Sequence, residues 1–255
     1  MNLAIIQARM GSTRLPNKVL KKVNNTPLLA YQIKRLKLSE KIDKIVIATG
    51  DNRQNDPIEK MCNQIKTPCF RGSEDDVLER YYKCSIKYPK YDHILRITGD
   101  CPLIDPYVVD QVIDYYKKNK FEYVSNVEPP TYPDGMDIEI FTKSILEKVH
   151  KAASLDSERE HVTWLIRKSN KFAKENKFIR GNHQAPHDFS HFRLTVDEER
   201  DFEVIKYLIK NSKLTDSYTH YISLLTKNPK IMLKNMSIIR NEGLAKSLKK
   251  DYENK

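Results

Sequence analysis

Cationic side chains gather just after the first apolar run of the chain. Arg9, Arg14 and Lys18 lie in the segment QARMGSTRLPNKVL together with Gly11. Glycine lets the backbone approach a ligand closely, and cations that one folded loop brings together suit the charge of a triphosphate. The segment matches neither G-x-x-x-x-G-K-[ST] nor G-x-G-x-x-G. We interpret it as a nucleotide-binding loop, with a solvated basic loop as the alternative.

Aspartates follow two later strand-like segments. Asp100 lies in RITGDCPLID, and Asp197 lies in RLTVDEERDFEVI. Mg²⁺ is usually held by one or two carboxylates together with phosphates, so Asp100 is predicted to bind the metal. Asp105, directly before Pro106, is predicted to cap a helix. For Asp197 the position fits a cap as well as a second metal ligand, and the position alone favours the cap.

The elements that must position these residues alternate in the first half of the chain. Short apolar runs predict strands over residues 3–8, 44–49, 68–71 and 93–98, and helical patterns cover residues 27–38, 75–87 and 106–118. This alternation predicts an α/β fold with a mainly parallel sheet covered by helices on both faces. Ligands of such sheets bind beyond the carboxyl ends of the strands, where both the basic loop and Asp100 lie.

The rhythm changes after Tyr123. Further strands are expected over residues 123–126, 136–141 and 192–196, and helices over residues 143–153, 158–168, 199–211 and 218–227. No repeat and no flexible linker divides the chain, so residues 1–255 are expected to form one domain. Within it, residues 123–190 are expected to bind the acceptor and could also form a homodimer surface, and residues 199–255 a helical C-terminal part.

Composition limits the classes of function. The 45 Lys and Arg against 34 Asp and Glu give a net charge of +11. Much of the excess lies in Lys- and Asn-rich segments, and no nucleic-acid recognition motif is present, so we predict a solvated basic face and no nucleic-acid partner. No apolar run is long enough to span a membrane and the N-terminus turns polar early, which predicts a soluble cytoplasmic protein. The four cysteines lack metal-site spacing and are expected to be reduced.

Seven blocks, in one order, resemble the spore coat polysaccharide biosynthesis protein F group of cytidylyltransferases, relatives of the CMP-Kdo and acylneuraminate cytidylyltransferases. They are IIQARMGSTRLPNKVL, RGSEDDVLERYY, RITGDCPLIDP, YPDGMDIEIF, SEREHVTWLIRK, RLTVDEERDFEVI and IIRNEGLAKSL. This nearly end-to-end resemblance implies a Rossmann-like nucleotidyltransferase fold, CTP as the donor, and Mg²⁺ held by Asp100 and Asp197. For Asp197 it favours the metal over the cap.

The resemblance also assigns residues to the nucleotide. It implies that Arg14, Lys18 and Asp100 are catalytic, and that Arg71, Ser73 and Arg96 lie where relatives read the base and ribose. The complete implied nucleotide-binding set is Gln7, Ala8, Arg9, Gly11, Ser12, Arg14, Lys18, Arg71, Ser73 and Arg96.

The acceptor side is predicted in the segments YPDGMDIEIF and SEREHVTW, whose polar groups could bind sugar hydroxyls or an amino group. The candidate residues are Tyr132, Asp134, Asp137, Glu139, Arg159, Glu160 and His161. His161 has no partner at metal-ligand spacing and is equally well a packed helix residue, so we do not assign it as a catalytic base. Trp164 is expected in the core.

Together these features predict an enzyme that transfers CMP from CTP to a small acceptor, an acidic or amino sugar, and releases pyrophosphate. In-line attack on the α-phosphate depends mainly on positioning and charge stabilisation. The alternatives are a non-catalytic nucleotide-binding protein of a polysaccharide pathway, and a nucleotidyltransferase or glycosyltransferase that uses another nucleotide donor.

Overall fold

The first strand, β1 (Asn2–Gln7), is buried inside a seven-stranded sheet, between β4 and β6. The structure is a computed structural model that describes residues 1–176 and 178–253. The strand order is β5-β4-β1-β6-β8-β7-β9, and β8 is antiparallel to both of its neighbours while every other neighbouring pair is parallel. The other strands of this sheet are β4 (Lys44–Gly50), β5 (Cys69–Gly72), β6 (His93–Thr98), β7 (Tyr123–Ser125), β8 (Glu139–Thr142) and β9 (Arg180–Asn182).

The chain changes direction across β1. It runs outward from β1 to β4 and β5 on one side and then returns to β6 on the other side. The carboxyl ends of β1 and β6 lie side by side, with Gln7 opposite Thr98. A crevice forms at such a switch point, because the loops that follow the two strands leave in opposite directions.

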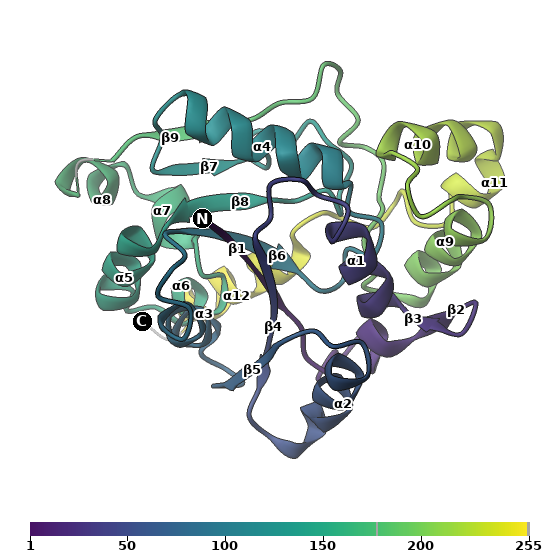
Figure 1. Ribbon diagram of the computed structural model, residues 1–255. Helices are drawn as coiled ribbons and strands as arrows, with labels where there is room; N and C mark the ends of the chain where they lie inside the picture. Colours follow the sequence, from purple (N-terminus) through teal and green to yellow (C-terminus); the bar gives the residue numbers. More distant parts are fainter. Residues whose placement is uncertain (177, 254–255) are drawn as a thin grey trace.

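Helices cover both faces of the sheet (Figure 1). Ala4 and Ile6 of β1 pack in a cluster with α1, α2, α4, α9 and α10, whereas Leu3 and Ile5 pack in a second cluster with α3, α5, α7 and α8. Alternate residues of a strand point to opposite faces, which explains why this run is apolar throughout. The helices are α1 (Leu28–Leu36), α2 (Asp56–Gln64), α3 (Val77–Ile86), α4 (Pro106–Lys118), α5 (Lys143–Ala152), α6 (Asp156–Glu160), α7 (Trp164–Lys168), α8 (Asn170–Glu175), α9 (Glu199–Lys210), α10 (Tyr218–Lys227), α11 (Pro229–Met232) and α12 (Glu242–Glu253).

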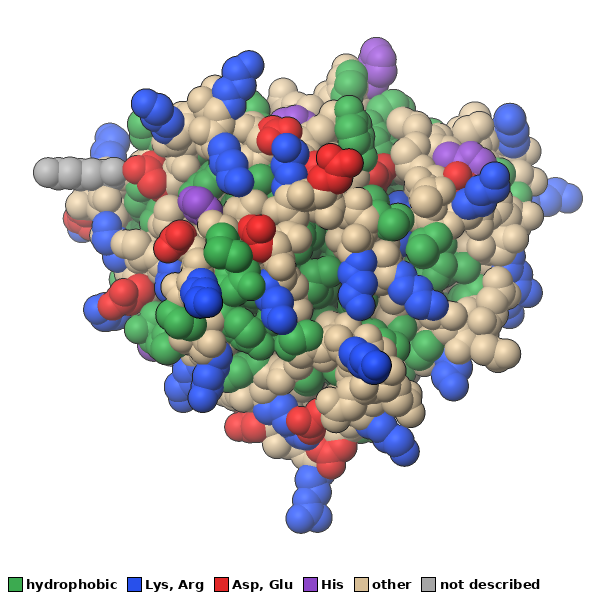
Figure 2. Space-filling view, viewed as in Figure 1, with side chains coloured by type: hydrophobic (Ala, Val, Ile, Leu, Met, Phe, Trp, Pro, Cys, Tyr) green, Lys and Arg blue, Asp and Glu red, His purple; other side chains and the backbone are tan. Residues whose placement is uncertain are grey.

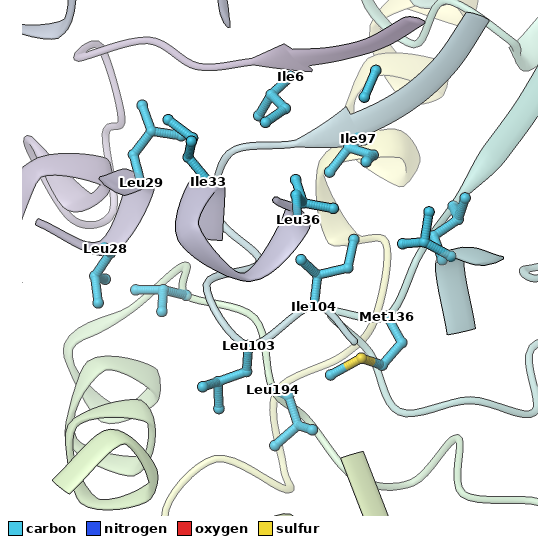
Figure 3. Close-up of a cluster of buried hydrophobic side chains, with 14 of the residues drawn as sticks. Ile6, Leu28, Leu29, Ile33, Leu36, Ile97, Leu103, Ile104, Met136 and Leu194 are labelled. Atoms are coloured by element: carbon cyan, nitrogen blue, oxygen red, sulfur yellow. The ribbon is translucent and has the colours of Figure 1, made fainter. Parts of the chain in front are cut away.

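The first cluster extends from the sheet to the segments that carry the two aspartates. In Figure 3, Ile6 and Ile97 of the sheet lie close to α1, with Leu103 and Leu194 below them. Leu103 follows Asp100 and Leu194 precedes Asp197, and both leucines are fully buried. Burial of these apolar neighbours fixes the backbone beside each aspartate.

Short elements connect the first strands. They are the 3-10 helices η1 (Lys18–Leu20) and η2 (Arg53–Asn55), and the small antiparallel pair β2 (Lys22–Val23) and β3 (Thr26–Pro27). No helix in residues 1–176 or 178–253 is long and apolar enough to cross a membrane. Lysine and arginine side chains are spread over the face shown in Figure 2 among acidic and neutral ones.

The predicted strands and helices of the first half are confirmed with ends within two residues, and so are β7, α5, α9 and α10. The prediction of a strand over residues 192–196 is wrong, because this extended segment makes only one bridge, between Asp134 and Arg193. The expected strand 136–141 begins only at Glu139. The Asn126 side chain takes the place of a strand partner there, since it donates to the carbonyl of Met136 and accepts from the amide of Ile138.

The expected helix over residues 158–168 is two helices, α6 and α7. The buried Val162 between them has a φ of 48°, a left-handed conformation that ends a helix. The sequence prediction missed α2, whose composition is polar, and β9, whose residues Arg-Gly-Asn resemble a turn.

Gly99 allows the turn after β6 to lie against the end of β1. Its amide donates to the carbonyl of Gln7 at 2.8 Å, and a Cβ at Gly99 would lie 2.8 Å from that oxygen and 3.0 Å from the Cβ of Ala8. We expect Gly99→Ala to lower the free energy of unfolding by about 1–3 kcal/mol, as overpacking of a closed site does.

The matched control is Gly243→Ala, because a Cβ there meets nothing within 4 Å. Its unfolding free energy should stay equal or rise slightly, since alanine is the better helix former. Urea denaturation measures both variants. Equal midpoints for Gly99→Ala and the wild type would show that the turn can move away from β1.

Candidate active site

Two adjoining cavities open at the carboxyl ends of β1 and β6. The first, named here the loop cavity, has a volume of about 320 Å³, and the second, the acidic cavity, of about 230 Å³. Both are lined by Gln7, Arg14, Thr98, Asp100, His161, Asp197 and Gly243. The loop cavity is lined by Gln7, Ala8, Arg9, Gly11, Ser12, Thr13, Arg14, Lys18, Val19, Val77, Arg80, Thr98, Gly99, Asp100, Glu160, His161, Asp197, Gly243 and Lys246.

The acidic cavity continues from Asp100 toward β8. Its lining holds more carboxylates than guanidinium groups, which gives it its name. It is lined by Gln7, Arg14, Arg96, Thr98, Asp100, Cys101, Val127, Asp134, Asp137, Glu139, His161, Arg167, Arg193, Thr195, Asp197, Asn241, Glu242, Gly243 and Leu244.

The loop after β1 has a defined shape. The amide of Met10 donates to the buried Asn55 side chain at 2.9 Å, and Met10 and Leu15 are themselves buried. Asn17 has a φ of 58° and turns the chain into η1, which places Lys18 inside the loop cavity. A loop anchored in this way is not the freely solvated basic loop of the alternative interpretation.

Lys18 joins the two aspartates predicted as metal ligands. Its Nζ donates to Oδ2 of Asp100 and to Oδ1 of Asp197, each at 2.8 Å. Burial alone would lower the pKa of Lys18, but the two carboxylates outweigh it and raise that pKa above its usual value. Burial would likewise raise the pKa of Asp100, but Lys18 lowers it to about 2. Lys18 and Asp100 are therefore charged at neutral pH.

Of the two aspartates considered as helix caps, Asp105 caps a helix and Asp197 does not. Asp105 is the predicted cap of α4, since its Oδ1 accepts from the amide of Tyr107 at 2.9 Å. At the start of α9 the capping carboxylate is Asp201, which accepts from the amides of Asp197 and Glu198. The interpretation of Asp197 as a cap is wrong, because its side chain bonds only cations.

Arg193 fixes the orientation of Asp197, and sequence reasoning missed it. Its guanidinium is 5% exposed and donates to Asp134 at 2.6 Å, to Oδ2 of Asp197 at 2.8 Å and to Asp201 at 2.9 Å. Asn235 also donates to the fully buried Asp201. With Oδ2 held by Arg193, Asp197 presents Oδ1 to the shared cavity wall.

The acidic cavity has a second ionic group, around Glu139. Its carboxylate accepts from Arg96, from the Tyr123 hydroxyl at 2.6 Å and from the Thr163 hydroxyl at 2.6 Å. Burial would raise the pKa of Glu139, but Arg96 and Arg167 outweigh it and lower that pKa. Arg167 is held from the far side by Glu128, with Nε to Oε1 at 2.8 Å. The Glu139 carboxylate therefore stays ionised, and these contacts hold it in one position.

Asp134 and Asp137 also line the acidic cavity. Burial and the nearby Asp137 raise the pKa of Asp134 to about 7, in spite of Arg240 and Arg193. Arg240 donates to Asp137 at 2.5 Å. These contacts come from residues 193 and 240, which lie far along the chain from Asp134.

The structure brings most predicted site residues together. Those in the loop cavity are Gln7, Ala8, Arg9, Gly11, Ser12, Arg14, Lys18, Asp100, Glu160, His161 and Asp197, and those in the acidic cavity alone are Arg96, Asp134, Asp137 and Glu139. Arg96, predicted to read the base or ribose, thus lies among the predicted acceptor residues. Burial lowers the pKa of His161 to about 4, so its imidazole is neutral at physiological pH.

Four predicted residues lie outside both linings. The guanidinium of Arg71 pairs with Asp56 at 2.6 Å and Glu59 at 2.8 Å. Ser73 accepts from the amide of Asp76. The nucleotide roles of Arg71 and Ser73 stay predictions. The acceptor roles of Tyr132 and Arg159, the other two residues, also stay predictions. Tyr132 is buried with its hydroxyl 3.2 Å from His183, and Arg159 donates to Asp76 at 2.5 Å.

Several lining residues were not singled out from the sequence. They include Arg80, Arg167, Arg193, Asn241, and Glu242, Gly243, Leu244 and Lys246 of α12. One signal for Arg193 was available: it stands four and eight residues before Asp197 and Asp201 in RLTVDEERD.

The donor set fits a magnesium ion. Oxygens of Asp100 and Asp197 converge on one cation, the Lys18 ammonium, so they can also converge on a metal. Within residues 1–176 and 178–253 no group of three or more His, Cys, Asp and Glu side chains is arranged to hold a metal. Two carboxylates suffice for Mg²⁺ when phosphates supply other ligands.

Comparison with known proteins finds relatives over nearly the whole chain. Residues 3–241 match the family model described as Cytidylyltransferase. An uncharacterized protein of Methanocaldococcus jannaschii is 38% identical over 92% of this chain and 95% of its own length. The spore coat polysaccharide biosynthesis protein SpsF of Bacillus subtilis is 34% identical over 89% of this chain and 95% of its own length.

A solved structure shares the fold. The cytidylyltransferase from Leptospira borgpetersenii serovar Hardjo-bovis superposes with a TM-score of 0.84 at 35% identity, over 94% of this chain and 99% of that one.

The geometry predicts a large stability cost for Arg193→Lys. A lysine keeps the charge but cannot hold three carboxylates with one planar group, so a buried carboxylate loses its partner. The free energy of unfolding should fall by roughly 2–4 kcal/mol, as when a buried ion pair is broken.

The control is Arg200→Lys, because Arg200 is 54% exposed and bonds Glu198 at the surface. Its effect should stay within about 0.5 kcal/mol. Chemical denaturation of both variants measures the difference. If Arg193→Lys is as stable as Arg200→Lys, the cluster does not depend on the guanidinium.

Proposed function

Because the chain belongs to the cytidylyltransferase family, we propose that it transfers CMP from CTP to a small sugar acceptor and releases pyrophosphate. The fold is the predicted Rossmann-like nucleotidyltransferase fold, with a mixed, mainly parallel sheet and helices on both faces. One observation carries the proposal: the Lys18 ammonium bridges Asp100 and Asp197 at the switch point of the sheet. Such a cluster of fixed charges suits a reaction in which phosphate charge shifts toward a leaving group.

The loop cavity is the proposed site of CTP. Arg9, Arg14 and Lys18 line it, and the backbone of Gly11 forms part of its wall. The cations would hold the triphosphate so that the α-phosphate faces the acidic cavity. As the bond to pyrophosphate breaks, Arg14 and Lys18 would stabilise the charge on the leaving oxygens.

Mg²⁺ is the proposed cofactor, with Asp100 and Asp197 as its protein ligands. When bound, Mg²⁺ would neutralise phosphate charge and so assist the departure of pyrophosphate. Arg193 would keep Oδ1 of Asp197 turned toward the shared wall, since it holds Oδ2 at 2.8 Å. Lys18, released from the two carboxylates, would then contact a phosphate.

The acidic cavity is the proposed site of the acceptor, because it adjoins the loop cavity at Asp100 and Asp197. Its guanidinium and carboxylate groups offer partners for the hydroxyls and for the acidic or amino group of a sugar. The Bacillus subtilis relative is named for spore coat polysaccharide biosynthesis, which supports a role in making a surface polysaccharide or glycan. CTP is a cytoplasmic metabolite, so we place the reaction in the cytoplasm.

Pyrophosphate release from each of the four NTPs, with Mg²⁺ and a panel of acidic and amino sugars, tests the function. CTP should support the highest kcat/KM, because the family uses a cytidylyl donor. Better turnover with UTP, GTP or ATP would show that the donor is not CTP, while the reaction would still be a nucleotidyl transfer. CTP binding without pyrophosphate release from any acceptor would favour the non-catalytic alternative, and cleavage of a nucleotide sugar would favour a glycosyltransferase.

The metal assignment predicts the effect of Asp100→Asn and Asp197→Asn. Asparagine keeps an oxygen in place but removes the charge that a hard cation needs. Each variant should lose about 100-fold or more in kcat, the scale of removing one transition-state contact. The double variant should lose less than the product of the two, since both residues serve one ion.

Asp114→Asn is the control, because Asp114 is 61% exposed and pairs with Lys41 at the surface, 2.8 Å away. It should keep the wild-type rate and Mg²⁺ dependence. Turnover and melting temperature are measured together. Near-normal turnover in either site variant would exclude that residue as an essential ligand.

A further inference from the structure

The C-terminal helix α12 forms part of the wall of the loop cavity. It lies beside α6 (Figure 1), and its residues Gly243 and Lys246 line the cavity. It begins at Glu242, one residue after the segment 3–241 that matches the family model. Its first residues also belong to the block IIRNEGLAKSL, in which the family resemblance assigns no site residue.

Glu242 pairs with Arg14, the residue that would contact the triphosphate in the proposed function. Oε2 of Glu242 accepts from Nη1 of Arg14 at 2.8 Å, and Nη2 of Arg14 lies 3.1 Å from Oδ1 of Asp197. Both ends of this guanidinium thus face carboxylate oxygens. A carboxylate and a phosphate present similar pairs of oxygens to an arginine, so Glu242 stands where a phosphate oxygen would bind.

The contact is easily exchanged. Arg14 is 32% exposed and Glu242 is 36% exposed, so water competes for the pair. Surface ion pairs contribute little to stability. A phosphate carries more charge than a carboxylate and forms a stronger bidentate contact with a guanidinium. The exchange of Glu242 for a phosphate on Arg14 is therefore favourable.

The rest of α12 is held by polar contacts at its surface. Ser247 Oγ donates to Glu160 at 2.7 Å and lies 3.0 Å from Nε2 of His161. Lys250 lies 3.6 Å from Asp156. None of the residues of this helix is buried. A helix docked without buried apolar side chains can shift at small cost.

We propose that α12 is a movable wall of the nucleotide site, in which Glu242 competes with a nucleotide phosphate for Arg14. The inference rests on the proposed function only in taking a polyphosphate as the ligand of the loop cavity. Before binding, Glu242 satisfies Arg14 and keeps the helix docked. On binding, a phosphate takes Arg14, and Glu242 retains Lys246, its partner on the same helix at 2.7 Å.

The test is the affinity of Glu242→Gln for inorganic triphosphate, measured by titration calorimetry on the full chain. Glutamine keeps the size of the side chain and removes its charge. The Kd should fall about two- to fivefold, the range expected from losing a competing surface ion pair. The matched control is Glu253→Gln on the same helix, which removes the same charge from a pair with Lys249 at 3.6 Å. Its Kd should equal that of the wild type.

A double-variant cycle separates competition for Arg14 from a general change in charge. In an Arg14→Gln background, Glu242→Gln should no longer tighten triphosphate binding, because the shared partner is gone. A gain that persists in this background, or an unchanged or weaker affinity of the single Glu242→Gln variant, overturns the proposal. Wild-type protein that binds no triphosphate also overturns it.

Binding of inorganic triphosphate is independent of CMP transfer, so the two conclusions fail separately. Triphosphate binding that responds to Glu242→Gln as expected, without pyrophosphate release from CTP, supports the movable wall and rejects the proposed function. Normal CTP turnover, with a triphosphate affinity that does not change in Glu242→Gln, supports the proposed function and rejects the movable wall.

Discussion

One ammonium group between two carboxylates constrains the whole site. Lys18, Asp100 and Asp197 come from the loop after β1, the turn after β6 and the extended segment before α9, yet Nζ lies 2.8 Å from both carboxylates. Buried charges are tolerated only when they are paired closely, so these three segments have to meet within hydrogen-bonding distance. The parallel pairing of β1 with β6 brings the first two together. The third is held by backbone bonds, since the amide of Val196 donates to the carbonyl of Asp100 at 2.9 Å.

A second set of ion pairs, around Arg193 and Asp201, stabilises this arrangement. Asp197 has cations on both oxygens, and Asp201 accepts from Arg193, from Asn235 and from two backbone amides. Removing any one partner would leave a carboxylate poorly satisfied in a site of low exposure. The cluster thus orients Asp197 and starts α9 with the same set of contacts. Asp197, the proposed metal ligand, and the start of α9 therefore depend on one arginine, Arg193.

Periodicity was sufficient to predict the sheet edge and the residues at it. The strands that precede Lys18 and Asp100 are short and mainly apolar, and their positions are confirmed. Contacts made by long side chains from distant segments were not predictable. Arg71 follows a predicted strand, but its guanidinium pairs with Asp56 and Glu59 of α2, a helix that the sequence pattern did not reveal. The break at Val162 was equally hidden, because Thr163 there donates to Glu139, a contact between segments far apart in the sequence.

The two cavities are built mainly from different parts of the chain and meet at Asp100 and Asp197. The loop cavity is built from residues 7–100 together with Glu160, His161, Asp197, Gly243 and Lys246. Most of the acidic cavity comes from residues 96–197 and 241–244. Asp100 and Asp197 belong to both linings, so in the proposed reaction the transferred phosphorus would lie beside them. Side chains such as Asp137 and Arg167 touch only the second cavity. In the proposed function, these side chains would be free to change with the acceptor while the donor site at Lys18 stays the same, because function depends on the residues of a site and not on the fold.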